Sequence, residues 1–255
     1  MIDIHCHILP EIDDGSQSRA MSLKMCRMAA ESGVTDIIAT PHMLDLYAGD
    51  EFKEKVKVRL DYMNGLLKEQ GVPVRIHKGA EVYASNDIIY SPDLSDYTLA
   101  GSRYLLFEFD FGTATFSYAK EVISIIQSQD LTPVIAHPER YDFTQRDYEN
   151  INRLADCGAL FQCNIGSLTG ELGKRSAKLS LEMLNAGAIS FLASDAHRVE
   201  FRNTDFNSMI DSLKGMKKQP DLSKLNLLLN ENPAKILKGE RVEYPSFSTL
   251  KKRLF

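Results

Sequence analysis

The residues best suited to chemistry in this chain are its histidines, because most of them end runs of apolar, β-prone residues. His5 and His7 alternate with apolar residues at the start of the chain, so a strand there places both imidazoles on one face. Two imidazoles on one strand face converge well on a metal ion, whereas a surface pair without metal is the plainer alternative. The other histidines favour the metal, since only His77 lies in the middle of a run. The histidines that end a run are His7, His42, His137 and His197.

Carboxylates accompany these histidines. Asp14 belongs to a loop after the first run, Glu81 lies near the end of a later run, and Asp195 precedes His197 by two residues. Glu108 lies among apolar residues, where a buried carboxylate is costly unless it meets a cation or a hydrogen-bond network. The candidate nitrogen and oxygen ligands are His5, His7, Asp14, His42, Glu81, Glu108, His137, Asp195 and His197.

This set of ligands is too large for one ion. Two ions would leave several ligands idle, whereas three ions that share a bridging carboxylate would use them all. Imidazole and carboxylate groups without cysteine suit manganese, iron, zinc or similar divalent metals. Clustered metals of this kind generate hydroxide at neutral pH and clamp a transferring phosphoryl group.

Seven strand-like runs alternate with helical segments and must position these ligands. Such alternation favours βα units and a parallel sheet. Ligands at the C-terminal ends of many strands favour a closed barrel, because an open sheet would separate its first and last strand ends. We therefore predict an α/β fold, a distorted seven-stranded (β/α) barrel with the metal site at the C-terminal ends of its strands. The later runs are 35–40, 74–83, 104–110, 132–140, 160–167 and 189–197, and the helices are 16–33, 52–71, 116–129, 148–156 and 176–185.

Length and composition indicate one large domain. The 255 residues are 44% hydrophobic, which is enough for a substantial core. We expect a single domain over 1–255, with 239–255 as a solvated, basic C-terminal extension. The stretch 84–103 lacks periodicity and is expected to be a long rim loop.

Composition also narrows the location and the partners. No apolar run approaches the length of a membrane span, and Met1 leads directly into the first strand, leaving no room for a signal peptide. We expect a cytoplasmic protein without membrane insertion, whose four cysteines are reduced thiols. The net charge of −5 provides no global attraction to nucleic acid, so any phosphate binding must be local.

The ordered set of motifs resembles the PHP (polymerase and histidinol phosphatase) superfamily. The opening MIDIHCHILPEIDDGSQS, together with GAEVY and VIAHPERY, is most similar to its bacterial manganese-dependent protein-tyrosine phosphatase branch. The resemblance runs from residue 1 to about 237 and implies a PHP-type barrel with three divalent ions. Manganese is the first expectation, and iron, zinc and magnesium are alternatives. The motifs are HCH, DDG with Asp14, PH with His42, GAE with Glu81, FEF with Glu108, AHPER and ASDAH.

The resemblance also implies how the ligands are shared. Glu81 would bridge two ions, and Arg140 and Arg202 would bind phosphate, with Arg198 as an alternative to Arg202. Arg140, Arg202, His42 and Asp195 would take part in catalysis. The three ligand sets would be His5, His7, Glu81 and Asp195; Glu81, Glu108 and His137; and Asp14, His42 and His197.

The implied activity is hydrolysis of phosphotyrosine by a metal-bound hydroxide, with a bacterial tyrosine kinase of capsule or exopolysaccharide synthesis as the protein substrate. An oligomer is compatible with this reading. No cysteine is followed six residues later by an arginine, so the C-x5-R phosphate loop of thiol-dependent phosphatases is absent from the sequence. The alternatives are a small-molecule phosphatase such as histidinol-phosphatase, an amidohydrolase, and a non-catalytic, metal-stabilised binding module. A nuclease fits the barrel but not the acidic charge balance.

Overall fold

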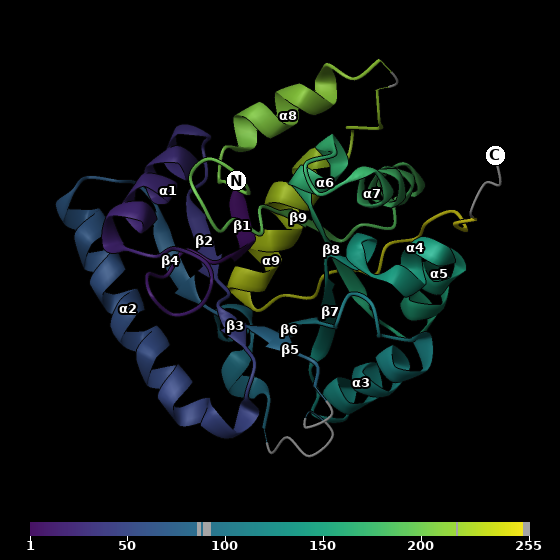
Figure 1. Cartoon of the computed structure of the whole chain (residues 1–255), viewed down its shortest axis with the longest axis horizontal. Helices are drawn as coiled ribbons and strands as arrows, with labels where there is room; N and C mark the ends of the chain where they lie inside the picture. Colours follow the sequence, from purple (N-terminus) through teal and green to yellow (C-terminus); the bar gives the residue numbers. More distant parts are fainter. Residues whose placement is uncertain (86–87, 89–92, 218, 252–255) are drawn as a thin grey trace.

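The computed structural model describes residues 1–85, 88, 93–217 and 219–251. In these ranges, parallel strands alternate with helices that cover their outer sides (Figure 1). The strands are β1 Ile2–Cys6, β2 Asp36–Ala39, β3 His42–Met43, β4 Arg75–Lys78, β5 Glu81–Tyr83, β6 Tyr104–Glu108, β7 Thr132–Ala136, β8 Leu160–Asn164 and β9 Phe191–Ala193.

The predicted helices all form, with ends shifted by a few residues. The short α4 and α6 and the C-terminal α8 and α9 were not predicted. The α-helices are α1 Arg19–Glu31, α2 Gly49–Glu69, α3 Phe116–Ser128, α4 Asp142–Arg146, α5 Glu149–Asp156, α6 Ile165–Thr169, α7 Lys174–Ala186, α8 Phe206–Lys214 and α9 Asn232–Lys238. Short helical turns are η1 Leu46–Ala48, η3 Ser95–Tyr97, η4 Leu99–Gly101, η5 Pro138–Arg140 and η6 Leu227–Glu231.

The strands form two parallel sheets in the described part of the chain, and the closed barrel that the sequence predicted is not confirmed. One sheet has the order β1-β2-β4 and the other the order β3-β5-β6-β7-β8-β9. The division falls at Pro41, which ends the predicted run 35–40 and lies between β2 and β3, and at Gly79, which interrupts the predicted run 74–83 between β4 and β5. Proline provides no amide hydrogen for a ladder. A Cβ on Gly79 would lie only 2.8 Å from Ile38, so glycine permits a close approach there.

The two sheets meet where β1 and the segment after β9 run side by side. The amide of Asp195 donates to the carbonyl of His5 at 2.8 Å, and the amide of His7 donates to the carbonyl of Ala196 at 3.0 Å. These bonds tie the first strand to the last one. The ends of β1 and β9, which are far apart in sequence, therefore deliver their side chains to the same place.

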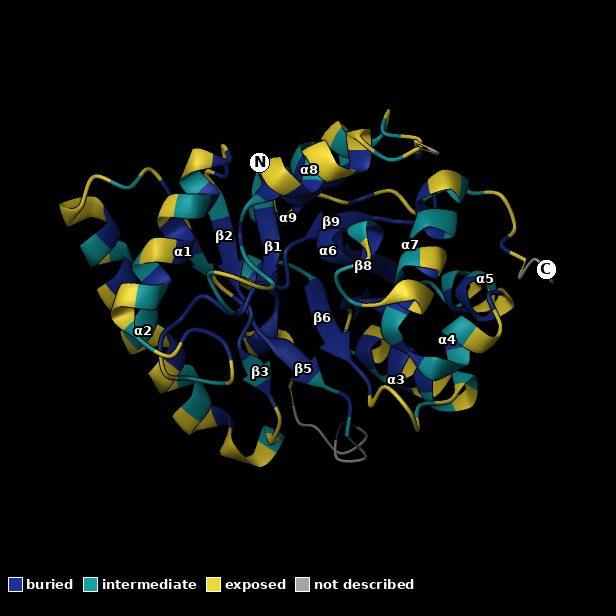
Figure 2. Cartoon of the chain, turned by 45° about the horizontal axis from the view of Figure 1, so that its top comes forward, coloured by how far each residue is buried: buried dark blue, intermediate teal, exposed yellow. Residues whose placement is uncertain are grey.

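The core occupies both sides of the strands, as the dark strands in Figure 2 show. Buried apolar side chains form two clusters, a smaller one to which strands of both sheets contribute and a larger one that includes many helix residues. Burial of this kind provides most of the free energy of folding. Residues of the smaller cluster include Ile4, Ile38, Leu106, Val134 and Phe191.

The described part of the C-terminal tail contacts the body at a few points. Val242 and Leu250 are buried, and the Tyr104 hydroxyl donates to the Glu240 carbonyl at 3.0 Å. Most other residues of 239–251 are exposed, so the extension is anchored at these points and solvated between them. Residues 252–255 lie outside the described residues, as do 86–87 and 89–92 of the expected rim loop. Residues 93–103 form η3, η4 and the turn before β6.

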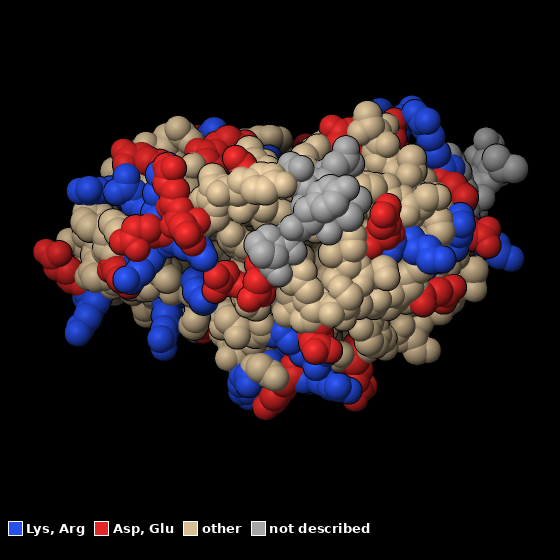
Figure 3. Space-filling view, turned by 90° about the horizontal axis from the view of Figure 1, so that it is seen from below, with Lys and Arg blue, Asp and Glu red and all other residues tan. Residues whose placement is uncertain are grey.

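The surface carries both signs of charge. Lysine and arginine side chains are interspersed with aspartate and glutamate on the face shown in Figure 3. Within the described ranges, no helix is both long and apolar enough to cross a membrane.

Candidate metal centre

All the predicted ligands come together around one pocket of about 380 Å³ at the C-terminal ends of the strands. Seven of the nine line the pocket, whereas His5 and His7 are buried beneath it in contact with Glu81 and Asp195. The register of neighbouring strands explains part of this convergence, since His42 of β3 pairs directly with Glu81 of β5. Parallel strands bring their C-terminal ends to one edge, so residues distant in sequence become neighbours.

The most buried cluster contains His5, His7, Glu81 and Asp195. Oε2 of Glu81 lies 3.1 Å from Nε2 of His5 and 3.2 Å from Nε2 of His7. Oδ1 of Asp195 lies 3.4 Å from the same two nitrogens. Ligands that share one metal at about 2.1 Å lie about 3.0–3.4 Å apart in octahedral or tetrahedral geometry, so these separations suit a common ion.

A second cluster lies at the mouth of the pocket. Oδ1 of Asp14 is 3.4 Å from Nε2 of His42 and 3.4 Å from Nε2 of His197, and His7 completes the group. The Asp14 side chain is 66% exposed, whereas that of His197 is 5% exposed. An ion here would face solvent on its Asp14 side, where a substrate can approach.

The third cluster differs in one member from the set that the resemblance implied. Nδ1 of His42 lies 3.1 Å from Glu81 and 3.0 Å from Glu108, so His42 joins these two carboxylates. His137 contacts Glu81 at 2.8 Å but stays 3.7 Å from Glu108. Glu81 and His42 therefore each contact more than one cluster, as bridging or shared ligands would.

Buried polar atoms test whether this arrangement fits metal ions. Among the described residues, Glu81 Oε2, Asp195 Oδ1, His42 Nδ1 and His197 Nε2 are buried without a hydrogen-bond partner. Such atoms are costly unless another interaction satisfies them. Each belongs to one of the clusters, and imidazole with carboxylate is a donor set for divalent metals. The unpartnered atoms and the chemistry of the donor set therefore fit divalent metal ions.

The electrostatics of the pocket keep its acids ionised. Burial alone would raise the pKa values of Glu81 and Asp195, but nearby His5 and further cationic or hydrogen-bonding groups hold both well below the usual range. Burial, together with His7, lowers the pKa of His197 to about 2, so this imidazole is neutral. Although burial opposes it, the close carboxylates of Glu108 and Glu81 raise the pKa of His42 to about 10. The ionised carboxylates of Glu81 and Asp195 therefore favour cations in this pocket.

Two polar residues of β8, which the sequence analysis left without a role, orient the ligands. Nδ1 of His5 donates to Oε1 of Gln162 at 2.7 Å, which leaves Nε2 of His5 facing the cluster. Nε2 of Gln162 donates to Oδ1 of Asn164 at 2.9 Å, and Nδ2 of Asn164 donates to Oδ2 of Asp195 at 2.7 Å. Two polar residues two apart in an otherwise apolar run were the available signal, because they share one strand face.

Asp13 orients His7 in the same way. Nδ1 of His7 donates to Oδ2 of Asp13 at 2.7 Å, and the backbone amide of His42 donates to the same oxygen at 3.0 Å. A carboxylate behind a ligating histidine fixes its tautomer and orientation. The sequence analysis singled out Asp14 and missed its neighbour.

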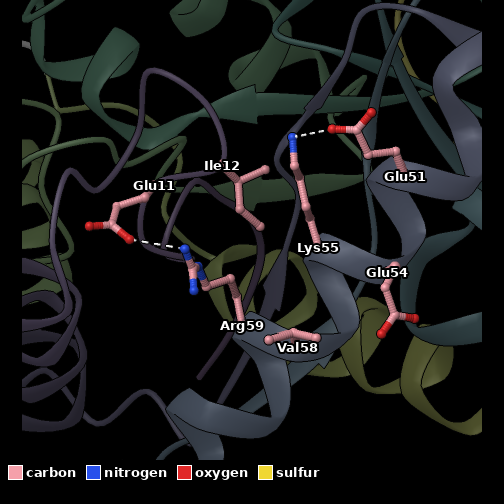
Figure 4. Close-up of a pocket in the computed structure, with 7 residues that line it drawn as sticks. All are labelled: Glu11, Ile12, Glu51, Glu54, Lys55, Val58 and Arg59. Carbon is pink, nitrogen blue, oxygen red and sulfur yellow. Dashed lines mark hydrogen bonds and ion pairs between the residues drawn. The ribbon is translucent and has the colours of Figure 1, made fainter.

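The loop that carries Asp13 and Asp14 is tied to α2. Arg59 donates through Nε to the Pro10 carbonyl at 3.2 Å and pairs through its guanidinium with Glu11 at 3.0 Å (Figure 4). Figure 4 also shows Lys55 paired with Glu51 within the same helix, at 2.7 Å. Arg59 therefore links the helix to the loop, whereas Lys55 does not.

Both predicted phosphate-binding arginines reach the pocket. Arg202 lies 2.7 Å and Arg140 lies 3.3 Å from Oδ2 of Asp195, and about a fifth of each side chain is exposed. The guanidinium of Arg140 also lies over the ring of Phe111, 4.3 Å from its centroid. Two planar cations at the edge of a metal cluster suit the oxygens of a phosphoryl group.

The structure separates the two candidates for the second arginine. Arg198 donates to the carbonyls of Gly15 at 2.6 Å and His197 at 2.8 Å, so it holds the ligand loop. Arg202, not Arg198, lines the pocket.

Three residues of the pocket have left-handed backbone conformations, in which non-glycine residues are rare. The φ angles are 33° at His137, 50° at Asp195 and 48° at Arg202. Conformations of this kind cost free energy and cluster at functional sites. His137 and Asp195 adopt this conformation just after β7 and β9, and Arg202 adopts it in the loop before α8.

The fold and the site define a metal-binding α/β protein, and comparison with known proteins gives its family. The family model for capsular polysaccharide synthesis, CpsB/CapC, matches residues 1–238. The chain belongs to the CpsB/CapC family.

Individual relatives agree with this assignment. Tyrosine-protein phosphatase YwqE of Bacillus subtilis is 34% identical over 259 residues, covering 100% of this chain and 99% of that protein. Tyrosine-protein phosphatase CpsB of Streptococcus pneumoniae is 29% identical, covering 95% of this chain and 100% of that protein. A crystal structure from work on YwqE and CpsB, described as unique metal-dependent tyrosine phosphatases, matches with a TM-score of 0.85 and 32% identity. It covers 99% of this chain and 100% of the matched chain.

Proposed function

We propose that this protein is a metal-dependent protein-tyrosine phosphatase, a phosphoric monoester hydrolase. The observation that carries the proposal is the joint presence of clustered metal ligands and two arginines around one pocket, in a chain of the CpsB/CapC family. Its full-length relatives YwqE and CpsB are named tyrosine-protein phosphatases, which supports the choice of substrate.

Divalent ions held by these residues would activate water and stabilise the charge on the transferring phosphoryl group. Arg140 and Arg202 bind the non-bridging oxygens and orient the phosphoryl group above the clusters. Asp195 holds both guanidinium groups in place through Oδ2. A phenolate leaving group with a pKa of about 10 needs little help from an acid.

A cysteine nucleophile does not suit this chain. Burial raises the pKa of Cys26 to about 12 and those of Cys6 and Cys163 well above the usual range. These thiols stay protonated at neutral pH and are poor nucleophiles. Cys157 lies at the C-terminal end of α5, outside the residues that line the pocket.

The finer proposal is three ions, with manganese first. The supporting observation is that His5, His7, Glu81 and Asp195 form one cluster, while Asp14 and Glu108 belong to two others. Elemental analysis of protein purified without chelator should find about three divalent ions per chain. Saturation at one ion would contradict the trinuclear centre.

We also infer that the two sheets act together as a distorted seven-stranded barrel. The backbone bonds between β1 and the segment after β9 support this inference.

The proposed substrate is a phosphotyrosine protein, specifically a tyrosine kinase of capsule or exopolysaccharide synthesis, encountered in the cytoplasm.

The experiment that tests the activity compares two substrates. Metal-loaded protein should hydrolyse a phosphotyrosine peptide faster than histidinol phosphate, and chelation with EDTA should abolish both reactions. Manganese should restore them. Faster turnover of histidinol phosphate would make the protein a small-molecule phosphatase, and turnover that survives thorough metal removal would reject the mechanism.

A further inference from the structure

A second groove shares a wall with the metal pocket. It has a volume of about 410 Å³ and lies at the start of α7. Arg140 and Phe111 line both cavities, so the groove continues the metal pocket along the surface. We name it the α7 groove and define it by Phe111, Arg140, Gln145, Lys174, Arg175 and Ser176.

The charge of the α7 groove is opposite to that of the protein. The chain carries 35 acidic against 30 basic residues, yet Arg140, Lys174 and Arg175 line the groove and no described acidic residue does. Lys174 and Arg175 are exposed. Among the described residues, no ion pair engages either of them, and the first turn of α7 contains no acidic residue.

The polar residues of the groove are held in place. Nε2 of Gln145 donates to the Glu139 carbonyl at 2.8 Å and contacts Oγ of Ser176 at 3.2 Å, which joins α4 to the first turn of α7. Arg140 is fixed between Asp195 and the Phe111 ring. The groove therefore has a firm floor, while its two outer cations remain available to a partner.

We propose that the α7 groove binds an acidic side chain of the phosphotyrosine-bearing protein, close in sequence to the phosphotyrosine in the metal pocket. An extended peptide advances about 3.3 Å per residue, so a flanking side chain can enter a cavity that shares a wall with the pocket. Cations without partners and a carboxylate on the substrate are complementary, and such pairs determine which partner is selected. This inference rests on the proposed tyrosine phosphatase function and specifies its substrate.

The test uses peptides that contain a non-hydrolysable phosphonate analogue of phosphotyrosine and differ only in a flanking glutamate or glutamine. The manganese-loaded protein should bind the glutamate peptide about three- to tenfold more tightly, as expected for two exposed ion pairs. The preference should shrink at high ionic strength, because exposed charges are screened. Equal affinity for the two peptides, wherever the glutamate is placed, would overturn the proposal.

Two variants separate the groove from general electrostatics. The double variant Lys174→Glu/Arg175→Glu should lose or invert the preference for glutamate over glutamine. The ratio of the two affinities is the readout, because a change in net charge affects all phosphorylated peptides. Lys57→Glu/Lys68→Glu makes the same charge change on α2, which lies across the molecule from α7 (Figure 1), and should keep the ratio. A preference that persists in the α7 variant would refute the assignment.

Hydrolysis of the matching phosphotyrosine peptides distinguishes this inference from the proposed function. If the protein prefers the glutamate analogue but does not hydrolyse any phosphotyrosine peptide, the groove stands and the phosphatase proposal fails. If both peptides are hydrolysed and bound equally well, the phosphatase proposal stands and the groove fails. Metal content, measured on each variant, checks that the metal centre has folded.

Discussion

Glu81 is the side chain on which the metal centre depends most. It is fully buried, and its two oxygens contact His5, His7, His42 and His137. Burial of a carboxylate is costly, and only cations or strong donors on every side make it stable. The surrounding residues divide into those that support the clusters and the two arginines that are proposed to bind the substrate, and the two kinds can be separated by experiment.

Arg140→Ala should retain its metal and its fold but lose most phosphotyrosine hydrolysis. Loss of one charge-assisted contact in the transition state costs about 2.7–4 kcal/mol, or about 10²–10³ in rate. Arg140→Lys should recover little, since lysine lacks the planar fork. Metal content and kcat/KM should be measured on the same preparation.

Arg153→Ala is the matched control for Arg140. Arg153 also lies over an aromatic ring, that of Phe116, at 3.7 Å, but on α5. Wild-type turnover in Arg140→Ala would remove this residue from the site, and loss of metal would make its role structural.

Gln162→Leu should weaken metal binding, because the imidazole of His5 would lose the acceptor that fixes its orientation. Loss of such a partner costs about 10–100-fold in metal affinity. Gln162→Glu keeps an acceptor for Nδ1 and should restore much of the affinity. Isothermal calorimetry during a titration with manganese measures the change in metal affinity. Equal affinities of the leucine variant and the wild type would show that Gln162 only fills space.

At the scale of elements, the predicted ligands come from strands and from the loops that follow them, and the most exposed one, Asp14, comes from a loop. His5 and Glu81 lie within β1 and β5, whereas Asp14 lies in a loop that α2 holds from outside. Strand residues are placed by the hydrogen-bonded ladder, but a loop needs separate anchors. The exposed cluster should therefore be the most easily weakened.

Arg59→Ala should lower metal affinity at the exposed cluster and leave the buried cluster intact. The loop would lose its bonds to α2, and we expect about a tenfold weakening of the weakest-bound ion. Lys55→Ala removes a cation from the same helix without touching the loop and should have no effect. Stoichiometry at limiting manganese is the measurement. A uniform loss of all ions from Arg59→Ala would contradict separate anchoring.

At the scale of the whole molecule, the metal centre joins the two sheets. His5 and His7 come from the sheet of β1, while Glu81 comes from the other sheet and Asp195 follows its last strand. Ions shared among these ligands would cross-link segments from both ends of the chain. Without ions, the sheets are linked there by hydrogen bonds and packing alone.

Metal removal should therefore lower the thermal stability of the whole protein. A ligand that binds only the folded state at 100 times its Kd stabilises that state by about 2.7 kcal/mol. The Tm should rise with manganese concentration and fall on chelation, and the gain should diminish at acidic pH, where protons compete for the imidazoles. Scanning calorimetry over a manganese series gives the answer, and a constant Tm would show that the ions do not couple to folding.

Local patterns in the sequence were enough to name the candidate ligands that the structure brings together. Histidines at the ends of apolar runs, and the carboxylates beside them, stood out because strand period and strand end are local properties. His5, His7, Glu81 and Asp195 could therefore be named as candidates, and helices such as α1 and α3 could be located. The alternation of strands with helices was enough to predict parallel strands whose C-terminal ends face one site.

Only the tertiary structure decided how the ligands are shared and what supports them. The placement of His42 beside Glu108 depends on the register between β3, β5 and β6, and Gln162 reaches His5 across 157 positions of sequence. Pro41 separates β2 from β3, and the two strands pair with different neighbours, so they belong to different sheets. Register, long-range packing and the choice between Arg198 and Arg202 all depend on contacts between distant segments, and no local pattern contains them.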